Sequence, residues 1–153
     1  MGNNLGFDAF PGFMGVTASI ALSNIGAAYG IAKAGVGVAG MGQRKPQIII
    51  KNLLPIIMAS ILGIYGMIVS VIIIKNIDLK TYSFKDGYKH LGAGLCCGIC
   101  SLGAGYAIGL VGDIGVRSIA QQEKIFVGML LILIFAEAIG LYGMIVAIMI
   151  AQK

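Results

Sequence analysis

Four long stretches of apolar residues, separated by short polar segments, make up most of the 153-residue chain. They predict helices over approximately residues 12–40, 48–75, 91–116 and 124–151. Each is long enough to cross a bilayer, which needs roughly 20 apolar residues in an α-helix. Because these stretches leave little sequence over, we expect a single membrane domain over residues 1–153, with no separate soluble catalytic domain.

Composition and charge agree with a membrane location. Hydrophobic residues make up 58% and charged residues 11% of the chain, and the mean hydropathy is +0.95, far from the soluble average. The net charge of +5 does not indicate nucleic-acid binding, because the basic residues lie in loops where they meet lipid headgroups. The basic residues do not indicate how the chain is oriented in the membrane, because each side carries five of them. One side has Arg44, Lys45, Lys51, Arg117 and Lys124, and the other has Lys75, Lys80, Lys85, Lys89 and Lys153.

The sequence repeats itself at an offset of 77 residues. The segment LGIYGMIV of the second predicted helix recurs as IGLYGMIV in the fourth, and residues 48–69 and 125–146 are identical at 11 of 22 positions. We interpret the chain as two tandem helical hairpins, repeat one over 12–75 and repeat two over 91–151. Hairpins with an even number of helices have the same orientation and are related by an axis along the membrane normal.

The first helix of each repeat carries small or polar residues along one face. In repeat two these residues recur at helical spacing: Gly94, Gly98, Ser101, Gly105, Gly109 and Gly112. Small residues let helix backbones approach closely in membranes, whereas the second helix of each repeat is rich in Ile, Leu and Met. We therefore predict a ring of many copies with the small-residue helices inside. In that ring Gly105 lines an interface between copies and Ala147 faces lipid.

Glu137 is the single charged residue of the stretch 125–151. At about 1.5 Å per residue it lies ~20 Å from Lys124 and ~24 Å from Lys153, which places its carboxyl in the middle of the membrane. A charge at that depth costs at least ~3 kcal/mol and marks a functional site. The natural task of a lone carboxyl in this position is to carry a cation.

The carboxyl of Glu137 has no counterpart in repeat one, because the 77-residue offset maps Glu137 onto Ser60. We predict that Tyr142 and Ser60 support Glu137 by hydrogen bonding. Hard cations such as sodium need several oxygen ligands. The residues expected nearby are apolar and favour a proton over sodium as the transported ion: Ile61, Leu62, Ala107 and Ile108.

The other polar residues predict structural roles. We expect Lys33 either to extend its charge to the headgroups or to pair with Asp113. We expect Pro55 to kink the second helix and His90 to be a solvated loop residue. No phosphate-binding GxxxxGK[ST] motif occurs in the sequence, and we expect neither a cofactor nor a metal. We assign no chemical role to three cysteines, which we interpret as small packing residues: Cys96, Cys97 and Cys100.

The chain resembles the proteolipid c subunits of vacuolar-type ATPases over approximately residues 12–151. The most specific segments are GDIGVRSIAQQ at 112–122 and ILIFAEAIGLYG at 132–143. The segment PQIIIKNLLPIIMASILGIYGMIV of the first repeat also resembles the family. The sequence departs from the family in two places. Glu123-Lys124 stands where members often have Pro-Arg, and the cysteine cluster is atypical.

This resemblance implies an all-α membrane protein of four transmembrane helices that assembles into an oligomeric rotor ring. ATP hydrolysis in a separate soluble sector would turn the ring, so the chain would have no catalytic site of its own. Glu137 would carry the proton, remaining neutral while it faces lipid because desolvation disfavours the charged form. It would ionise on meeting an arginine of the stator a subunit.

The resemblance also implies partners and a location. The partners would be other proteolipids in a homo-oligomeric or mixed ring, the a subunit, the d subunit, the central-stalk subunits and membrane lipid. The termini would face the lumen of a vacuole or another acidic endomembrane compartment. Loops 41–47 and 117–123 would face the cytosol and the soluble sector.

Two other functions stay open at this point. A small proton-coupled transporter would explain Glu137, but 153 residues leave little room for a substrate cavity. A glycine-rich membrane channel or structural proteolipid would explain the small-residue faces but not the central carboxyl. The number of copies in the assembly distinguishes these functions, because a rotor ring has many copies and a transporter one or two.

Overall fold

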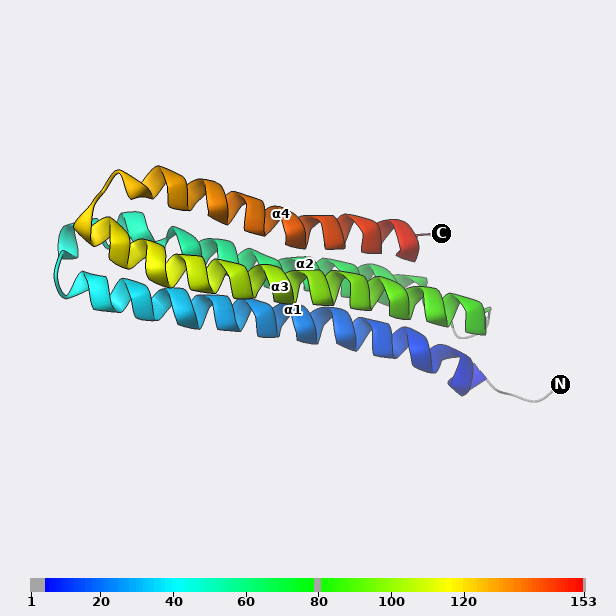
Figure 1. Cartoon of the computed structure of the whole chain (residues 1–153). Coiled ribbons are helices and arrows are strands. Elements are labelled where there is room, and N and C mark those ends of the chain that lie inside the picture. Colours follow the sequence, from blue (N-terminus) through cyan, green and yellow to red (C-terminus); the bar gives the residue numbers. More distant parts are fainter. Residues whose placement is uncertain (1–4, 79–80, 153) are drawn as a thin grey trace.

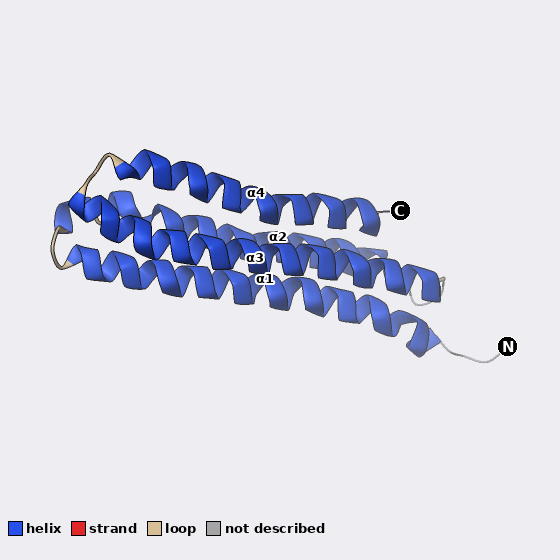
Figure 2. Ribbon diagram, viewed as in Figure 1, coloured by secondary structure: helices blue, strands red, loops and turns tan. Residues whose placement is uncertain are grey.

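Four long helices form one elongated bundle in the computed structural model, which describes residues 5–78 and 81–152 (Figure 1). Helices are the only regular elements in this part of the chain (Figure 2). Each long helix is apolar enough to cross a membrane, which confirms the predicted all-α class with four transmembrane helices. Their bounds are Leu5–Gly42 for α1, Leu54–Asn76 for α2, Phe84–Gln121 for α3 and Ile125–Ala151 for α4.

Successive helices run in opposite directions, so the bundle has two distinct ends (Figure 1). We call the hairpin end the one where α1 turns into α2 and α3 turns into α4. The terminal end holds the start of α1, the end of α4 and the connection from α2 to α3. The odd-numbered helices are therefore parallel to each other, as are the even-numbered ones.

The helix boundaries differ from the prediction where polar residues continue a helix. Helix α3 begins at Phe84 rather than near residue 91, because Ser83 caps it. The Ser83 hydroxyl accepts a hydrogen bond from the Asp86 amide, which satisfies one of the free N–H groups of the first turn. A boundary set by hydropathy alone misses this polar first turn.

The start of α2 also differs from the prediction. The chain passes through two short 3-10 turns, Pro46–Ile48 and Ile50–Leu53, before α2 begins at Leu54. Pro55 consequently lies in the first turn of α2, where the missing N–H of proline has no helical partner to lose. The predicted kink at Pro55 is wrong for this reason.

The small-residue face of α3 packs on α1 of the same chain. A Cβ atom added to Gly105 would collide with the carbonyl of Gly26. Tyr29 and Tyr106, which the 77-residue offset relates, stack with ring centroids 5.1 Å apart. The tyrosine stack joins equivalent positions of the two repeats. Gly105 meets Gly26 of its own chain, so the prediction that Gly105 lines an interface between copies is wrong. Six glycines of α3 meet α1 closely: Gly87, Gly94, Gly98, Gly105, Gly109 and Gly112.

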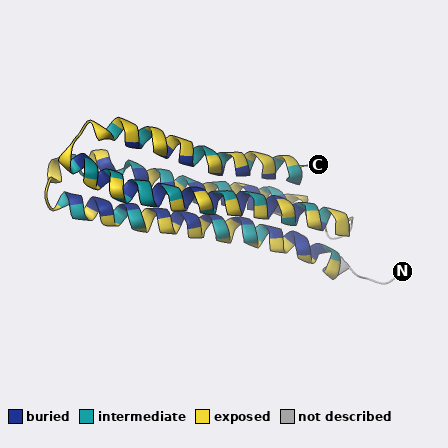
Figure 3. Cartoon of the chain, viewed as in Figure 1, coloured by how far each residue is buried: buried dark blue, intermediate teal, exposed yellow. Residues whose placement is uncertain are grey.

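Helix α4 buries a narrow stripe and leaves the other positions intermediate or exposed, as Figure 3 shows. Ala147 belongs to the buried stripe, with no exposed surface, and clusters with Val69 and Cys97. The prediction that Ala147 faces lipid is therefore wrong. The exposed positions of α4 are instead large and apolar, as in Phe135 and Ile139, and suit contact with lipid or a neighbouring copy.

The three cysteines lie on the faces of α3 that pack against other helices. All three are free thiols, and Cys97 is fully buried. A Cβ atom on Gly143 would collide with Cys100, so α4 approaches α3 closely at this thiol. No group of three metal-ligating side chains occurs among the described residues.

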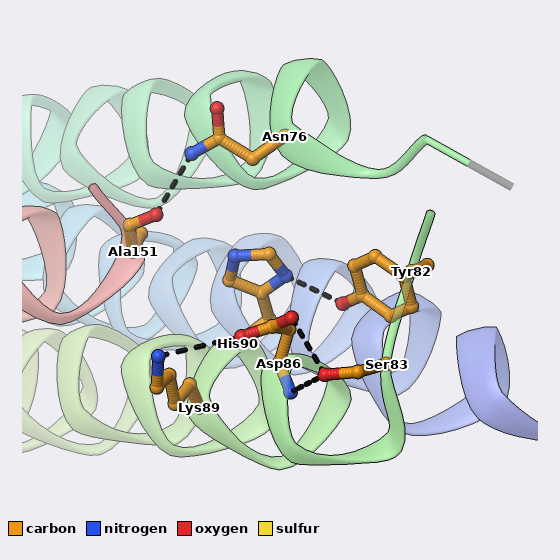
Figure 4. A network of polar contacts seen from close by, with 7 residues as sticks. All are labelled: Asn76, Tyr82, Ser83, Asp86, Lys89, His90 and Ala151. Atoms are coloured by element: carbon orange, nitrogen blue, oxygen red, sulfur yellow. Dashed lines mark hydrogen bonds and ion pairs between the residues drawn. The ribbon is translucent and has the colours of Figure 1, made fainter. Parts of the chain in front are cut away.

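Polar contacts tie the terminal end together, as Figure 4 shows. His90 is buried, with its Nδ1 2.5 Å from the Tyr82 hydroxyl, and it also interacts with the Ala151 carbonyl of α4. That carbonyl accepts a second hydrogen bond, 2.8 Å long, from the Asn76 side chain of α2. Burial, and to a smaller extent the charge of Asp86, raises the pKa of Tyr82. The prediction that His90 is a solvated loop residue is wrong, because α3 extends past it.

We expect Gly105→Leu to prevent the normal packing of α1 on α3. The new side chain would meet the backbone of Gly26, and backbone cannot swing aside as a flexible side chain can. Overpacking commonly costs 1–3 kcal/mol, so we expect a loss of at least about 3 kcal/mol here. Thermal unfolding of the purified protein in detergent, followed by circular dichroism, measures the effect.

Gly103→Leu is the matched control for this prediction. Gly103 lies on the same helix two residues away, is exposed, and has no atom within 4 Å of an added Cβ. This variant should unfold close to the wild-type temperature. Equal melting temperatures for the two leucine variants would show that the close contact between Gly105 and Gly26 does not hold the repeats together.

Candidate functional site

Glu137 lies at the middle of α4, with 12 residues of the helix before it and 14 after it. The neighbouring helix α3 runs antiparallel. Gly115 of α3 meets Met129, and Gly143 of α4 meets Cys100. These contacts fix the register of the two helices and place Glu137 level with the centre of the bundle. The predicted depth of the carboxyl agrees with this position.

The carboxyl group of Glu137 is buried, although the residue as a whole is partly exposed. Both carboxylate oxygens are inaccessible and have no hydrogen-bond partner at ordinary distance among the described residues. Leu62 of α2 packs one turn further along, against Gly140. An unpaired ionised carboxylate in apolar surroundings is very costly, so this geometry suits a carboxyl that is neutral inside the bundle and ionises when a charged partner approaches.

Tyr65 of α2 is the polar side chain that the structure brings to this carboxyl. Its hydroxyl lies close enough to Glu137 to interact with it electrostatically. The Tyr65 ring packs against both apolar clusters of the bundle, which restricts its movement. The sequence reasoning missed Tyr65, although the 77-residue offset pairs it with Tyr142 and could have identified it.

The two residues predicted to support Glu137 lie elsewhere. The Tyr142 side chain is 63% exposed on the outer face of α4. Ser60 is exposed on α2, and its hydroxyl donates to the Ile57 carbonyl of its own helix at 2.7 Å. No contact within the described chain joins either residue to Glu137, and their supporting roles stay predictions. Both lie on surfaces that a neighbouring copy in a ring could reach.

Another carboxyl of the helical bundle, that of Asp113, is paired. Asp113 of α3 forms an ion pair with Arg117 one turn further on, at 2.7 Å from Nε to Oδ1. This pair replaces the Lys33–Asp113 pair that the sequence left open. Glu137 is thus the one carboxyl that the described part of the chain leaves buried without a cationic partner.

Comparison with known proteins gives consistent matches over nearly the whole chain. The family model that describes the C subunit of ATP synthase matches twice, at residues 14–73 and 91–150, close to the two predicted repeats. The chain is 51% identical over 146 residues to the 16 kDa proteolipid c subunit of the V-type proton ATPase of Ascaris suum, covering 94% of this chain and 91% of that protein. It has the same identity and coverage with the second 16 kDa proteolipid of the Caenorhabditis briggsae V-type proton ATPase. The c′ subunit of the Saccharomyces cerevisiae V-type proton ATPase is 51% identical over 145 residues, 94% of this chain and 88% of that protein.

Proposed function

The chain belongs to the C-subunit family of ATP synthases, and on this premise we propose that it is a proton-carrying proteolipid in the membrane rotor ring of a vacuolar-type ATPase. Relatives that are named as V-type proton ATPase proteolipids and share about half of its residues support this function. The single observation that carries the proposal is the buried carboxyl of Glu137 at the middle of α4, which has no cationic partner among the described residues. The chain itself hydrolyses no ATP and belongs to an ATP-driven proton pump.

Glu137 moves a proton by a cycle of protonation and ionisation. While the site faces lipid the neutral acid is the stable form, since an isolated charge at this depth is costly. When rotation brings the carboxyl to an arginine of the stator a subunit, the favourable ion pair stabilises the carboxylate and the proton leaves. A new proton from the opposite side then neutralises Glu137, and the cycle repeats at the next copy.

The proposed partners follow from this cycle. The ring contains further copies of this chain or related proteolipids, and the stator a subunit lies at its edge. The d subunit and the central stalk transmit rotation from the soluble sector. The proton movement acidifies a vacuole or another endomembrane compartment.

A proton fits the site better than sodium does. A dehydrated sodium ion needs several oxygen ligands in fixed positions. The structure brings one hydroxyl, that of Tyr65, to the Glu137 carboxyl, and Leu62 and Gly140 pack nearby. One carboxyl with one hydroxyl is sufficient to hold a proton, which needs a single covalent bond and one acceptor.

We expect Tyr65→Phe to slow proton transport by about two- to tenfold without abolishing it. The estimate takes the 0.5–1.5 kcal/mol of a typical hydrogen bond, which the Tyr65 hydroxyl would form with the protonated carboxyl after a small approach. The hydroxyl would then steady the carboxyl without carrying the proton. Tyr142→Phe is the matched control, because it removes the same kind of hydroxyl from the equivalent position of the other repeat. The measurement is the initial rate of ATP-driven acidification of vesicles at equal amounts of assembled complex. A larger effect of Tyr142→Phe would show that the exposed tyrosine, reached from another copy, is the one that supports Glu137.

The number of copies tests the proposed function against the transporter and channel alternatives. We expect projection images of the detergent-solubilised assembly to show a closed ring of many four-helix units. A monomer or dimer in such images would contradict the rotor and favour a small proton-coupled transporter. A fixed ring that carries no proton when joined to the soluble sector would favour a structural proteolipid.

A further inference from the structure

A basic cavity lies at the hairpin end, between the last turns of α1 and α3. Its volume is about 340 Å³, within the range of small-ligand sites. Three cationic side chains line it, Arg44, Lys45 and Arg117, and no acidic side chain is among its lining residues. The proton cycle at Glu137 makes no use of this cavity.

The guanidinium group of Arg117 is anchored at one of its nitrogens. Its Nε donates to the Asp113 carboxylate at 2.7 Å, and its two terminal nitrogens lie 3.3 Å and 3.9 Å from the position of an added Cβ on Gly40. The glycine therefore lets the guanidinium lie against the end of α1. One of the five N–H donors of Arg117 is used by Asp113 and the others are available. A planar fork of this kind binds the oxygens of phosphate in pairs.

The other two cations are positioned by the end of α1. The backbone N–H groups of Arg44 and Lys45 both donate to the Met41 carbonyl, at 2.9 Å and 3.0 Å. Pro46 then begins the next turn with a fixed φ angle. This short reversal places two neighbouring cationic residues on the same cavity as Arg117. The charge of Asp113 is already matched by Arg117, so the cavity keeps an excess of positive charge.

The cavity lies at the depth of lipid headgroups. The contact between Gly115 and Met129 places Arg117 level with residue 127, ten residues from Glu137. This separation corresponds to about 15 Å along a helix, which is half of the ~30 Å hydrocarbon thickness. Arg44 and Lys45 lie further out, beyond the end of α1. The three cations therefore lie where the hydrocarbon gives way to phosphate groups.

From this geometry we infer that the cavity binds the headgroup phosphate of an anionic membrane lipid. Basic pockets between transmembrane helices are the usual sites for such headgroups, and an arginine fork with two further cations matches a phosphate of more than one negative charge. A lipid with a zwitterionic headgroup leaves part of this charge unmatched. The inference depends on the membrane position of the helices and not on proton carriage by Glu137.

The test is lipid retention by the intact membrane complex, purified in detergent and examined by native mass spectrometry. The probes are phosphatidylinositol 4-phosphate, phosphatidylcholine and inorganic phosphate. The double variant Arg44→Gln, Lys45→Gln leaves the ion pair of Arg117 and Asp113 intact, and Arg117→Gln removes the fork. A second double variant, Lys75→Gln, Lys85→Gln, removes the same charge from exposed residues near the terminal end and is the matched control.

We expect the wild-type complex to retain phosphatidylinositol 4-phosphate at least about tenfold better than phosphatidylcholine. Each lost cation should weaken retention about fivefold, so the Arg44 and Lys45 double variant loses about 25-fold while the control double variant stays close to wild type. Equal retention of the two lipids, or a double variant that binds like wild type, would overturn the inference. Displacement of the lipid by an equal concentration of inorganic phosphate would also overturn it, since free phosphate would then be the ligand.

Discussion

Glu137→Gln is expected to abolish proton transport while the ring still assembles. Glutamine has nearly the shape of protonated glutamic acid, so the packing around Leu62 and Tyr65 should survive. The amide is neutral and can pass through lipid, but it cannot release or accept a proton in the transport cycle. The measurement is ATP-driven acidification of vesicles, together with the amount of intact ring on a native gel.

Two further variants define the specificity of this effect. Glu123→Gln removes a carboxyl from the exposed connection between α3 and α4 and should leave transport unchanged. Glu137→Asp should be impaired but active, because the shorter side chain withdraws the carboxyl by about 1 Å and small misplacements are costly in proton transfer. Acidification by Glu137→Gln above a few per cent of the wild-type rate would remove Glu137 from the transport path.

A hydrophobic carbodiimide is expected to label Glu137 and to stop transport in proportion to the labelling. The reagent attacks protonated carboxyls in apolar surroundings, and the two buried oxygens of Glu137 lack a hydrogen-bond partner among the described residues. Asp113 should be spared because it forms an ion pair with Arg117, and Glu123 because it is exposed to water. Peptide mapping by mass spectrometry identifies the labelled residue. Labelling shared among the three carboxyls, or full labelling without loss of transport, would contradict the special state of Glu137.

The parts of the structure that follow from short-range sequence patterns could be predicted. Four membrane-spanning helices follow from four apolar stretches. In lipid every backbone N–H and C=O group needs an internal hydrogen bond, and only helices and closed barrels supply all of them. The depth of Glu137 follows from counting residues along its helix. The duplication follows from identities at a constant offset, and the double match to the family model agrees with it.

The parts that depend on which surfaces meet could not be predicted in the same way. A face of small residues allows close packing, but it does not reveal whether the partner is the same chain or another copy. Gly105 meets Gly26 within one chain, whereas the pattern alone predicts an interface between copies. The prediction that Ala147 faces lipid is wrong for a related reason. Helix α4 is apolar on nearly all sides, so hydropathy does not distinguish its buried stripe from its exposed positions.

Side chains that act across helices were also difficult to identify. Tyr65 reaches Glu137 from α2, far away in the sequence, and the sequence alone favoured the nearer Tyr142. His90 is buried by Tyr82 and by the end of α4, contacts that no local pattern reports. A polar residue near a helix end is usually solvated, and here three chain segments converge to cover it.

The central claim is that Glu137 carries the transported proton as a neutral acid within the membrane. Infrared difference spectroscopy of the reconstituted ring, recorded between neutral and strongly alkaline pH, tests this claim most directly because a protonated carboxyl has its own C=O absorption. We expect a carboxylic acid band at neutral pH that disappears as the carboxyl ionises, is missing in Glu137→Gln and is kept in Ser60→Ala. A wild-type ring without this band at neutral pH, or a Glu137→Gln ring that retains it, would contradict the assignment.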